Sequence, residues 1–368
     1  MKGRLFALLL LFCSLEPARA GEEELILTFL GDIMIHPVNY CLDDYTVIYA
    51  AIAPYLRRDN LTFANLEFPV DASRPYAGYP CFNGCPAYVE AAVNAGVDVF
   101  SLANNHSFDQ GREGVLQTLR TLEGLRRSPG RHINWSGLRG NLLRRFSPTE
   151  IRTDGFRIGF LAVTQMVNRS MPHGYVQVVD YRSPSRRREF LASVRELASG
   201  YDLFILSYHG GIEYALQAEP EKIAFFRELA AAGVDIVYAH HPHVPQGTVR
   251  VPAAGGGAAL ILASTGNLIS GMTWSIDPAH PEDPRAFTGD SALWQVRVVR
   301  RAGTVTVDQV RPLLVTNYRN PRNELVVVPF SGLLCRELPA PWREYYRRRY
   351  HLLRNHLQSA CLSLTALE

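Results

Sequence analysis

The sequence carries almost no surplus of charge of either sign. Among its 368 residues, 38 Lys and Arg are matched by 35 Asp and Glu, which leaves a formal net charge of +3 at pH 7. Proteins that wrap nucleic acid or another polyanion owe their affinity to clustered lysine and arginine. So small a surplus excludes that class of protein, and we expect no nucleic-acid partner.

Long apolar runs are also scarce, and the one near the N-terminus is shorter than a membrane span. It extends from Leu5 to Cys13, follows two basic residues and precedes Ala18-Arg19-Ala20, which has the small-x-small pattern of a signal-peptidase site. A membrane-spanning helix needs roughly 20 apolar residues. We therefore predict a cleaved secretory signal over residues 1–20 and an exported protein, located in the periplasm, outside the cell or on its surface.

Cysteine is the third scarce feature. Five cysteines remain after residue 20, and none has the paired spacing of a zinc finger. Cys81-Phe-Asn-Gly-Cys85 has the spacing of a tight disulfide around an Asn-Gly turn, and an oxidising compartment permits such a bond. Pairing is not fixed by sequence alone, and an odd count leaves at least one thiol unpaired. The other cysteines open to pairing are Cys41, Cys335 and Cys361.

The predicted elements follow different orders in the two parts of the chain. Apolar strands alternate with helices over the first two-thirds, which indicates a largely parallel α/β arrangement. The last third has strand-like runs with turn residues between them, which favours antiparallel pairing. The predicted strands of the first part are 25–30, 61–66, 97–102, 156–163, 202–206 and 234–238, and the predicted helices are 45–57, 86–96, 112–125, 184–198 and 219–232.

No linker or low-complexity segment divides residues 21–330, so we predict one domain there. Residues 331–368 form a C-terminal extension with an Arg- and Tyr-rich amphipathic helix pattern over 341–357. A basic amphipathic helix either packs on its domain with the charged face in water or contacts a membrane or an anionic polymer. We favour packing on the domain.

Polar side chains follow five of the apolar strands at the point where each strand ends. They are Asp32, Glu67, Asn105 with His106, His209, and the group His240, His241 and His243. The carboxyl ends of parallel strands meet at one edge of a sheet. A single such residue is typical of a turn or a helix cap, and Asp109 fits the latter role for the helix that follows it. Five strand ends together indicate a shared site.

The residue types at these strand ends are metal ligands. Carboxylate and amide oxygens together with imidazole suit Mn, Zn or Fe. A carboxylate that bridges two cations about 3.5–4 Å apart is typical of sites that activate water for phosphoryl displacement. His241 and His243 alternate on an extended segment, so both rings point the same way. We predict a site for one or two divalent ions.

These residues stand in motifs that resemble the bacterial CapA (capsule and poly-γ-glutamate biosynthesis) family. In chain order the motifs are Gly31-Asp-Ile-Met34, Asn65-Leu-Glu-Phe-Pro69, Ser101-Leu-Ala-Asn-Asn-His106, Ser207-Tyr-His-Gly-Gly-Ile-Glu-Tyr214, His240-His-Pro-His-Val-Pro-Gln246 and Ser264-Thr-Gly-Asn-Leu268. The resemblance extends from about residue 25 to 270. It implies a calcineurin-like metallophosphatase fold of α/β class, a β-sandwich of two mixed sheets flanked by helices in four αββα layers.

The same resemblance implies roles for the matching residues. Asp32 and His243 would bind a first metal, and Glu67 would bridge it to a second. The second metal would be held by Asn105, His209 and His241. His106 would donate a proton or stabilise the transition state. Further residues expected around the ligands or at the substrate are His36, Asn104, Asp109, Glu213, Tyr214, His240 and Asn267.

One position departs from the metallophosphatase pattern. These proteins generally begin with Asp-x-His, and Met34 occupies the place of that histidine. The first metal is therefore one ligand short. His36, four residues after Asp32, either replaces the missing ligand or is an ordinary surface residue before Pro37.

Two functions fit these observations. The first is a metal-dependent hydrolase in capsule or poly-γ-glutamate-type polymer biosynthesis, with a metal-activated water and an envelope polymer or a small phosphorylated compound as substrate. The alternative is a non-catalytic component of a polymer assembly or export machine, with capsule-synthesis membrane proteins as partners. The ligand set and His106 favour the first function, whereas Met34 favours the second.

Overall fold

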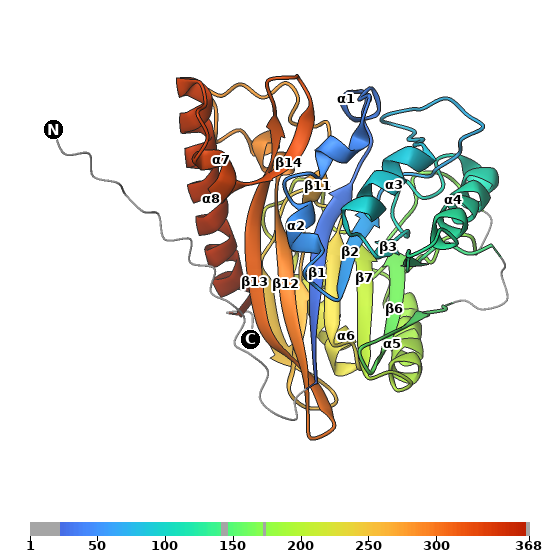
Figure 1. Ribbon diagram of the computed structural model, residues 1–368. Helices are drawn as coiled ribbons and strands as arrows, with labels where there is room; N and C mark the ends of the chain where they lie inside the picture. Colours follow the sequence, from blue (N-terminus) through green and yellow to red (C-terminus); the bar gives the residue numbers. More distant parts are fainter. Residues whose placement is uncertain (1–22, 141–145, 172–173, 366–368) are drawn as a thin grey trace.

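The computed structural model describes residues 23–140, 146–171 and 174–365 (Figure 1). The predicted signal sequence, with Cys13, lies outside the described residues. Within the described ranges, no helix combines the length and the apolar character needed to cross a bilayer.

The first of two sheets is mixed and is built around the first strand of the chain. Its order is β14 (Leu325–Pro329), β13 (Thr304–Arg319), β12 (Asp290–Arg301), β1 (Glu23–Ile33), β2 (Leu61–Leu66), β3 (Val99–Ser101) and β4 (Asn134–Ser136), with β11 (Asn267–Ile269) also paired to β1. Strands β1 to β4 run parallel to one another, while β12, β13 and β14 are antiparallel.

The second sheet is also mixed. Its order is β5 (Thr149–Thr153), β6 (Phe156–Thr164), β7 (Leu203–His209), β8 (Ile236–His240), β10 (Ala258–Leu262) and β9 (Thr248–Pro252). The four central strands are parallel, and β5 and β9 are antiparallel edges. Helices flank both sheets, so the predicted fold class, two mixed sheets flanked by helices, is confirmed.

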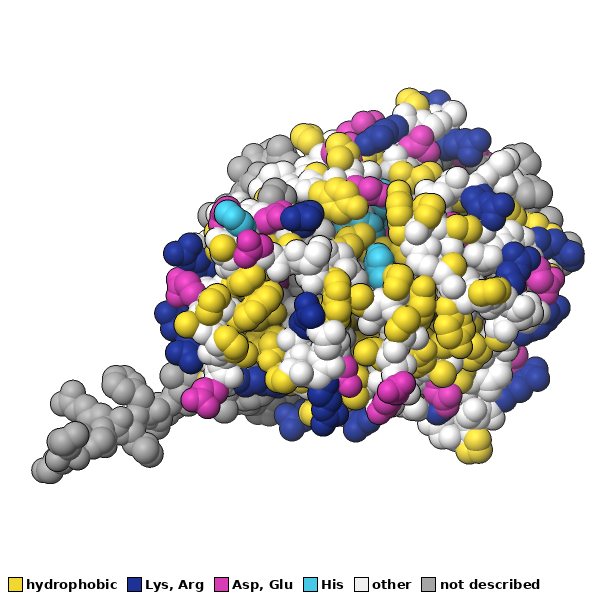
Figure 2. Space-filling model, turned by 90° about the horizontal axis from the view of Figure 1, so that it is seen from above, with side chains coloured by type: hydrophobic (Ala, Val, Ile, Leu, Met, Phe, Trp, Pro, Cys, Tyr) yellow, Lys and Arg dark blue, Asp and Glu magenta, His cyan; other side chains and the backbone are white. Residues whose placement is uncertain are grey.

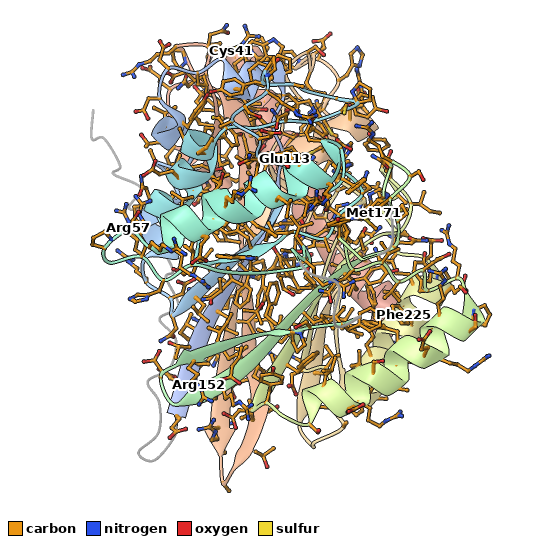
Figure 3. The ribbon with its side chains drawn as sticks, turned by 90° about the vertical axis from the view of Figure 1, so that its right-hand side faces the viewer. Cys41, Arg57, Glu113, Arg152, Met171 and Phe225 are labelled. Atoms are coloured by element: carbon orange, nitrogen blue, oxygen red, sulfur yellow. The ribbon has the colours of Figure 1, made fainter. Side chains whose placement is uncertain are left out.

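The helices lie mainly on the outer faces of the sheets. They are α1 (Pro37–Tyr40), η1 (Tyr45–Ile48), α2 (Ala53–Leu56), α3 (Pro86–Ala95), α4 (Gly111–Arg126), α5 (Pro184–Ala198), α6 (Pro220–Ala231), η2 (Pro284–Gly289), α7 (Phe330–Leu334) and α8 (Ala340–Thr365). Figure 3 shows α4 and α5 on the side of the molecule that faces the viewer. Glu113 lies on α4, and Phe225 of α6 lies close to α5. Phe190, Val194 and Ala198 are spaced by four on α5 and form its buried face.

Aromatic side chains join the two sheets. The ring of Phe29 on β1 stacks on Phe63 at 4.9 Å and meets Tyr238 of β8 at 5.0 Å. Phe63 in turn contacts Phe160 of β6 at 5.3 Å. Because both faces of the central strands are covered, residues 25–33 are buried without a break, as expected for parallel strands between two layers.

The register of β1 places polar residues at one level of the sheet. Asp32 is paired with Asn65 on β2 and with Asn267 on β11. The approach of β11 requires glycine at position 31, because a Cβ there would lie 2.2 Å from the carbonyl oxygen of Gly266. The Asp32 N–H donates to that same carbonyl at 2.8 Å. Gly31 therefore holds Asp32 at the top edge of the sheet.

The predicted elements differ from the structure where local pattern and long-range packing disagree. The predicted helix 45–57 is two short helices, η1 and α2. Strand β11 was not predicted, because three residues are too few for a periodic signal and only pairing with β1 defines them. The last third is antiparallel as predicted, except that β10 pairs in parallel with β8 and β11 pairs in parallel with β1.

Helix α8 packs along the body and reaches the segment that follows β8. His356 donates to the carbonyl of Pro245 at 2.9 Å, and the N–H of Thr248 donates to the sulfur of Cys361 at 3.3 Å. Arg349 is fully buried and binds Asp290 of β12 through two nitrogens, with a third bond to the Pro281 carbonyl at 3.0 Å.

Replacing Arg349 by methionine is expected to destabilise the protein by about 3–5 kcal/mol, because Asp290 is left buried without its partner. The matched control is Arg347→Met on the same helix, whose side chain is 58% exposed and pairs with Glu344. That exposed pair is worth roughly 0–1 kcal/mol. Urea unfolding of both variants measures the difference, and equal losses would contradict the role given to Arg349.

Candidate metal centre

The polar strand ends predicted from sequence converge at one edge of the molecule. Asp32 lies near the end of β1, Glu67 directly follows β2, and Asn105 follows β3. His209 ends β7, and the histidines at 240, 241 and 243 lie at and beyond the end of β8. All of them are buried.

Two groups of potential ligand atoms share one carboxylate. Asp32, Glu67 and His243 form the first group, and Glu67, His209 and His241 form the second; within each, the ligand atoms lie within 4.8 Å of one another. Glu67 Oε1 is 3.5 Å from His209 Nε2 and 3.8 Å from His243 Nε2. Glu67 is thus in the position of a bridging carboxylate.

Asn105 and Asp32 complete the two groups from opposite sides. The Oδ1 atom of Asn105 lies 2.8 Å from His209 Nε2, beside the second group. In the first group, Asp32 Oδ2 lies 3.6 Å from His243 Nδ1. A third set, Glu213, His241 and His243, also lies within 4.8 Å, but Glu213 is exposed and belongs to the mouth of the site.

Several buried polar atoms of this centre lack a hydrogen-bond partner among the described residues. They are Asp32 Oδ2, Glu67 Oε1, His240 Nε2 and His241 Nδ1. Native proteins rarely leave such atoms unsatisfied, since each costs about 1–3 kcal/mol. Carboxylate and imidazole lone pairs that face one another share one natural partner, a divalent cation. The residues therefore fit a metal site.

For Asp32, His209 and His241, the direction of the pKa shift suits cation binding. Burial raises the pKa of Asp32, but hydrogen bonds from His240 and His243 outweigh it and hold that pKa well below its usual range. Burial, followed by the neighbouring His243, lowers the pKa of His241 to about 3. Burial and His241 likewise depress the pKa of His209. Neutral imidazole and ionised carboxylate are the forms that bind metal.

The backbone of the last ligand segment is strained. His241 has φ 94° and His243 has φ 58°, in the left-handed region that non-glycine residues rarely occupy. Such conformations cost about 1–3 kcal/mol each and gather at functional sites. The strain turns two rings separated by one residue toward the two ligand groups.

Residues behind the ligands hold them in place. His240 Nδ1 lies 3.0 Å from Asp32 Oδ1 and 3.2 Å from Thr265 Oγ1. Asn65 donates to the same Asp32 oxygen at 2.8 Å. Asn267 Oδ1 lies 2.9 Å from His243 Nδ1. His240 and Asn267, both expected around the ligands, thus contact Asp32 and His243.

Met34 and His36 lie away from the two ligand groups. Met34 is buried in the hydrophobic core beneath the centre, and its carbonyl accepts the Tyr88 hydroxyl at 3.1 Å. His36 Nδ1 accepts the N–H of Gly271 at 3.0 Å and its ring meets Phe82 at 5.4 Å. His36 is in neither ligand group, so the structure gives no replacement ligand there, and it is more deeply packed than a surface residue.

Acid is expected to destabilise the metal-free protein through His36. Burial lowers the pKa of His36 to about 4, so between pH 6.5 and about 4 the unfolded chain binds this proton and the folded protein does not. Stability from this group is lost as the pH falls through that window, at about 1.4 kcal/mol per pH unit. His36→Asn keeps an acceptor for Gly271 and should flatten the fall in Tm between pH 7 and 4.5. The exposed His280 provides a control; parallel profiles for wild type and His36→Asn would contradict the assignment.

His106 is buried beside the second ligand group and is paired with Asp109. The His106 Nδ1 and Asp109 Oδ2 atoms are 2.7 Å apart, and the same carboxylate oxygen accepts the Phe82 N–H at 2.8 Å. The prediction that Asp109 caps the following helix is wrong. Helix α4 begins two residues later, at Gly111 with φ 65°, and has no side-chain cap. The imidazole is the stronger partner for this carboxylate.

Asn104 fastens this loop to the end of β2. Its Nδ2 donates to the Leu66 carbonyl at 2.8 Å, and its Oδ1 accepts the His106 N–H at 3.2 Å. Asn104 therefore positions the loop. Glu213 and Tyr214, also predicted near the substrate, lie at the mouth, with Glu213 Oε1 4.0 Å from His241 Nε2.

Sequence reasoning missed the loop after β6. Asn168 is exposed and its Nδ2 lies 3.4 Å from His106 Nε2, while Arg169 donates to the Asp109 carbonyl. These two residues follow Gln165 at another parallel strand end. Their place just after a parallel strand could have suggested that they lie near the site, but neither Asn nor Arg is by itself diagnostic of a metal site.

The suggested Cys81–Cys85 disulfide is absent. Cys85 is buried at the start of α3, whereas Cys81 faces the Asp109 loop and donates to its carbonyl at 3.2 Å. Asn83, between them, binds the carbonyls of Asp71 and Pro75, both at 3.0 Å. These bonds shape a broader loop than a disulfide-closed turn.

Comparison with known proteins links this site to a family. Residues 26–272 match the family described as bacterial capsule synthesis protein PGA_cap. The matched range contains every residue of the two ligand groups, together with His106 and Asn267.

Individual relatives carry related descriptions. The capsule biosynthesis protein CapA of Bacillus anthracis is 27% identical over 301 residues, which cover 78% of this chain and 67% of that protein. The PGA biosynthesis protein CapA of Bacillus subtilis is 22% identical over 300 residues, covering 77% and 70%. A "probable polyglutamine synthesis accessory protein" of Mycobacterium tuberculosis is 25% identical over 193 residues, covering 50% of this chain and 49% of that protein, so the chain spans about half of its length.

Two solved structures with a similar arrangement are described as a phosphatase and a phosphoesterase. A novel phosphatase from Mycoplasma pneumoniae matches with 16% identity and a TM-score of 0.49, over 82% of this chain and 96% of that one. The calcineurin-like phosphoesterase YfkN from Bacillus subtilis matches with 13% identity and a TM-score of 0.39, over 91% and 99%.

Proposed function

The chain belongs to the bacterial capsule synthesis protein family PGA_cap, and from this premise we propose that it is a metal-dependent hydrolase of capsule or poly-γ-glutamate-type polymer biosynthesis. The bond it cleaves is a phosphoester or a linkage of the envelope polymer. The observation that carries this proposal is the shared carboxylate of Glu67 between two buried ligand groups, in which Asp32 Oδ2, Glu67 Oε1 and His241 Nδ1 have no hydrogen-bond partner among the described residues.

Each part of the centre has a role in this reaction. Asp32, Glu67 and His243 would hold one ion, and Glu67, Asn105, His209 and His241 the other. A divalent cation bound there lowers the pKa of water and polarises an ester oxygen. Asp109 holds His106 through Nδ1, which leaves Nε2 as the nitrogen that donates a proton to the leaving oxygen. Burial of the ligands excludes bulk water and strengthens these electrostatic effects.

The proposal is tested with the purified mature protein, stripped of metal and reloaded separately with Mn, Zn or Fe. Substrates are bis(4-nitrophenyl) phosphate and poly-γ-glutamate. We expect metal-dependent turnover that His106→Ala reduces and that exposed His280→Ala leaves unchanged. Protein that carries metal but turns over neither substrate, with His106→Ala indistinguishable from wild type, would refute hydrolysis of these substrates.

The second candidate is a non-catalytic component of a polymer assembly or export machine. The observation that favours it is Met34, whose burial in the core leaves the first ligand group with one residue fewer than the metallophosphatase pattern. On this alternative the exported protein binds capsule-synthesis membrane proteins, and the metal is structural. Cells that carry His106→Ala then produce normal polymer, whereas cells that lack the whole protein do not.

A further inference from the structure

Exposed aromatic side chains are concentrated at the mouth of the metal centre. Among the residues that the structure describes, large apolar side chains with substantial exposure are Tyr76, Tyr79, Ile212, Tyr214 and Leu352. Tyr79 lies on the loop before α3, and Ile212 and Tyr214 lie on the loop after β7. Viewed from above, histidine side chains occupy a hollow bordered by apolar ones (Figure 2). Two loops distant in sequence thus bring apolar surface to one place.

The two tyrosines lie beside different histidines of the centre. The ring of Tyr79 is 6.5 Å from that of His106 and is supported by Phe82 at 6.4 Å. The ring of Tyr214 is 5.9 Å from that of His243. Burial, followed by the charges of Glu213 and Tyr79, raises the pKa of Tyr214, so the two tyrosines are within electrostatic range of each other. Each tyrosine is therefore next to a different histidine of the centre.

Tyr214 is held firmly although it is half exposed. Tyr214 has φ 62°, and its N–H donates to the Pro242 carbonyl at 2.8 Å. The loop around it is fixed by Gln165, which accepts the Gly211 N–H at 2.9 Å, and by Gln246, which donates to the Ala215 carbonyl at 2.7 Å. A strained, half-exposed tyrosine costs stability and buries little surface. Such a residue is typical of a binding site that is formed before its ligand arrives.

We propose that Tyr79 and Tyr214 form an aromatic rim that binds a ring-bearing group of the substrate next to the bond that is cleaved. This inference rests on the proposed function and adds the class of substrate to it. Tyrosine faces stack on flat rings and on the apolar faces of sugar rings, while the hydroxyl groups remain available for hydrogen bonds. The substrate is then a diester or related linkage that carries a sugar or an aromatic ring on the retained side, and a small aliphatic ester is a poor substrate.

The test compares two diesters that release the same leaving group. Bis(4-nitrophenyl) phosphate retains a ring after cleavage, and methyl 4-nitrophenyl phosphate retains a methyl group. Tyr79→Ala and Tyr214→Ala are each expected to raise KM for the first about three- to tenfold with little change in kcat, and to leave the second unchanged. Tyr79→Phe should restore most of the loss.

The matched control is Tyr76→Ala. Tyr76 lies on the same loop as Tyr79 and is also exposed, but its ring packs against Tyr40 at 5.9 Å. We expect no change in KM for either diester. The rim would be overturned if Tyr76→Ala raised KM as much as Tyr79→Ala does. It would also be overturned if Tyr79→Ala and Tyr214→Ala raised KM equally for the ring-bearing and the methyl diester.

A binding experiment separates the rim from the hydrolase proposal. Calorimetric titration of metal-loaded His106→Ala protein with bis(4-nitrophenyl) phosphate needs no turnover. Weaker binding after Tyr79→Ala or Tyr214→Ala supports the rim even if the wild type proves inactive, whereas no binding, or unchanged binding, overturns it. Competition by glucose 1-phosphate and by adenosine monophosphate then distinguishes a sugar ring from a base as the preferred ring.

Discussion

Replacing His106 by asparagine is expected to lower turnover by about 10²–10⁴-fold while the metal content stays the same. His106 belongs to neither ligand group, so its removal leaves every potential ligand in place. Its ring is held by Asp109 at 2.7 Å, and loss of the ring removes the proton donor beside the leaving group. Steady-state kinetics on the reloaded protein, together with elemental analysis, measure both quantities.

Asp109→Asn is the companion variant. Its amide keeps the size of the carboxylate and can still accept the Phe82 N–H, which the carboxylate binds at 2.8 Å. The amide is a weaker acceptor for His106 Nδ1 than the carboxylate, so the ring is less firmly oriented and we expect an intermediate loss of kcat. A His106→Asn variant that retains wild-type turnover, or loses its metal, would contradict a role in proton transfer.

Glu67→Gln is expected to abolish binding of both ions, because one carboxylate serves both ligand groups. Elemental analysis should find metal near zero, against one or two ions in wild type. Metal should then no longer raise the Tm, whereas wild type gains about 2.7 kcal/mol at a metal concentration one hundred times Kd. The control is Glu282→Gln, an exposed residue that should change neither quantity.

In the metal-free protein, Glu67→Gln is expected to raise the stability of the fold instead of lowering it. Burial and the charge of Asp32 raise the pKa of Glu67 well above its usual value. When the pKa of an acid is higher in the folded protein than in the unfolded chain, the unfolded chain ionises at a lower pH. Above that pH the group therefore destabilises the folded protein. Metal-free Glu67→Gln should therefore be more stable than metal-free wild type at pH 7. Glu67 is not the bridging ligand if Glu67→Gln is less stable than wild type both with and without metal, or if the variant keeps two ions.

The parts of the site that could be predicted from sequence are those set by strands. Asp32, Glu67 and His209 each stand at or next to the end of a buried strand, and parallel pairing brings such ends to one edge whatever the loops do. Apolar runs and their lengths contain that information. The two mixed sheets with flanking helices followed from the resemblance carried by the same motifs.

The loops contain the parts that could not be predicted. Asp109 precedes the N-cap residue of α4 by one position and binds His106 instead of the helix, and no local pattern encodes that choice of partner. Arg169 and Tyr79 reach the site on irregular segments whose paths depend on packing against distant residues. The sequence shows that such residues lie in loops, but it does not show which loops meet in space.

The pairing of the first strand with late parts of the chain has a consequence for assembly. Strand β1, which carries Asp32, lies between β2 and β12, and residue 29 pairs with residue 294. Helix α8, at the other end of the described chain, contacts Pro245, two residues beyond His243. Contacts so distant in sequence form slowly, because a long loop must close before they contribute. During synthesis, Asp32 on β1 emerges from the ribosome long before β12, the strand that pairs with β1. The strand that carries Asp32 therefore gains its neighbour β12 only after residue 301 has been synthesised.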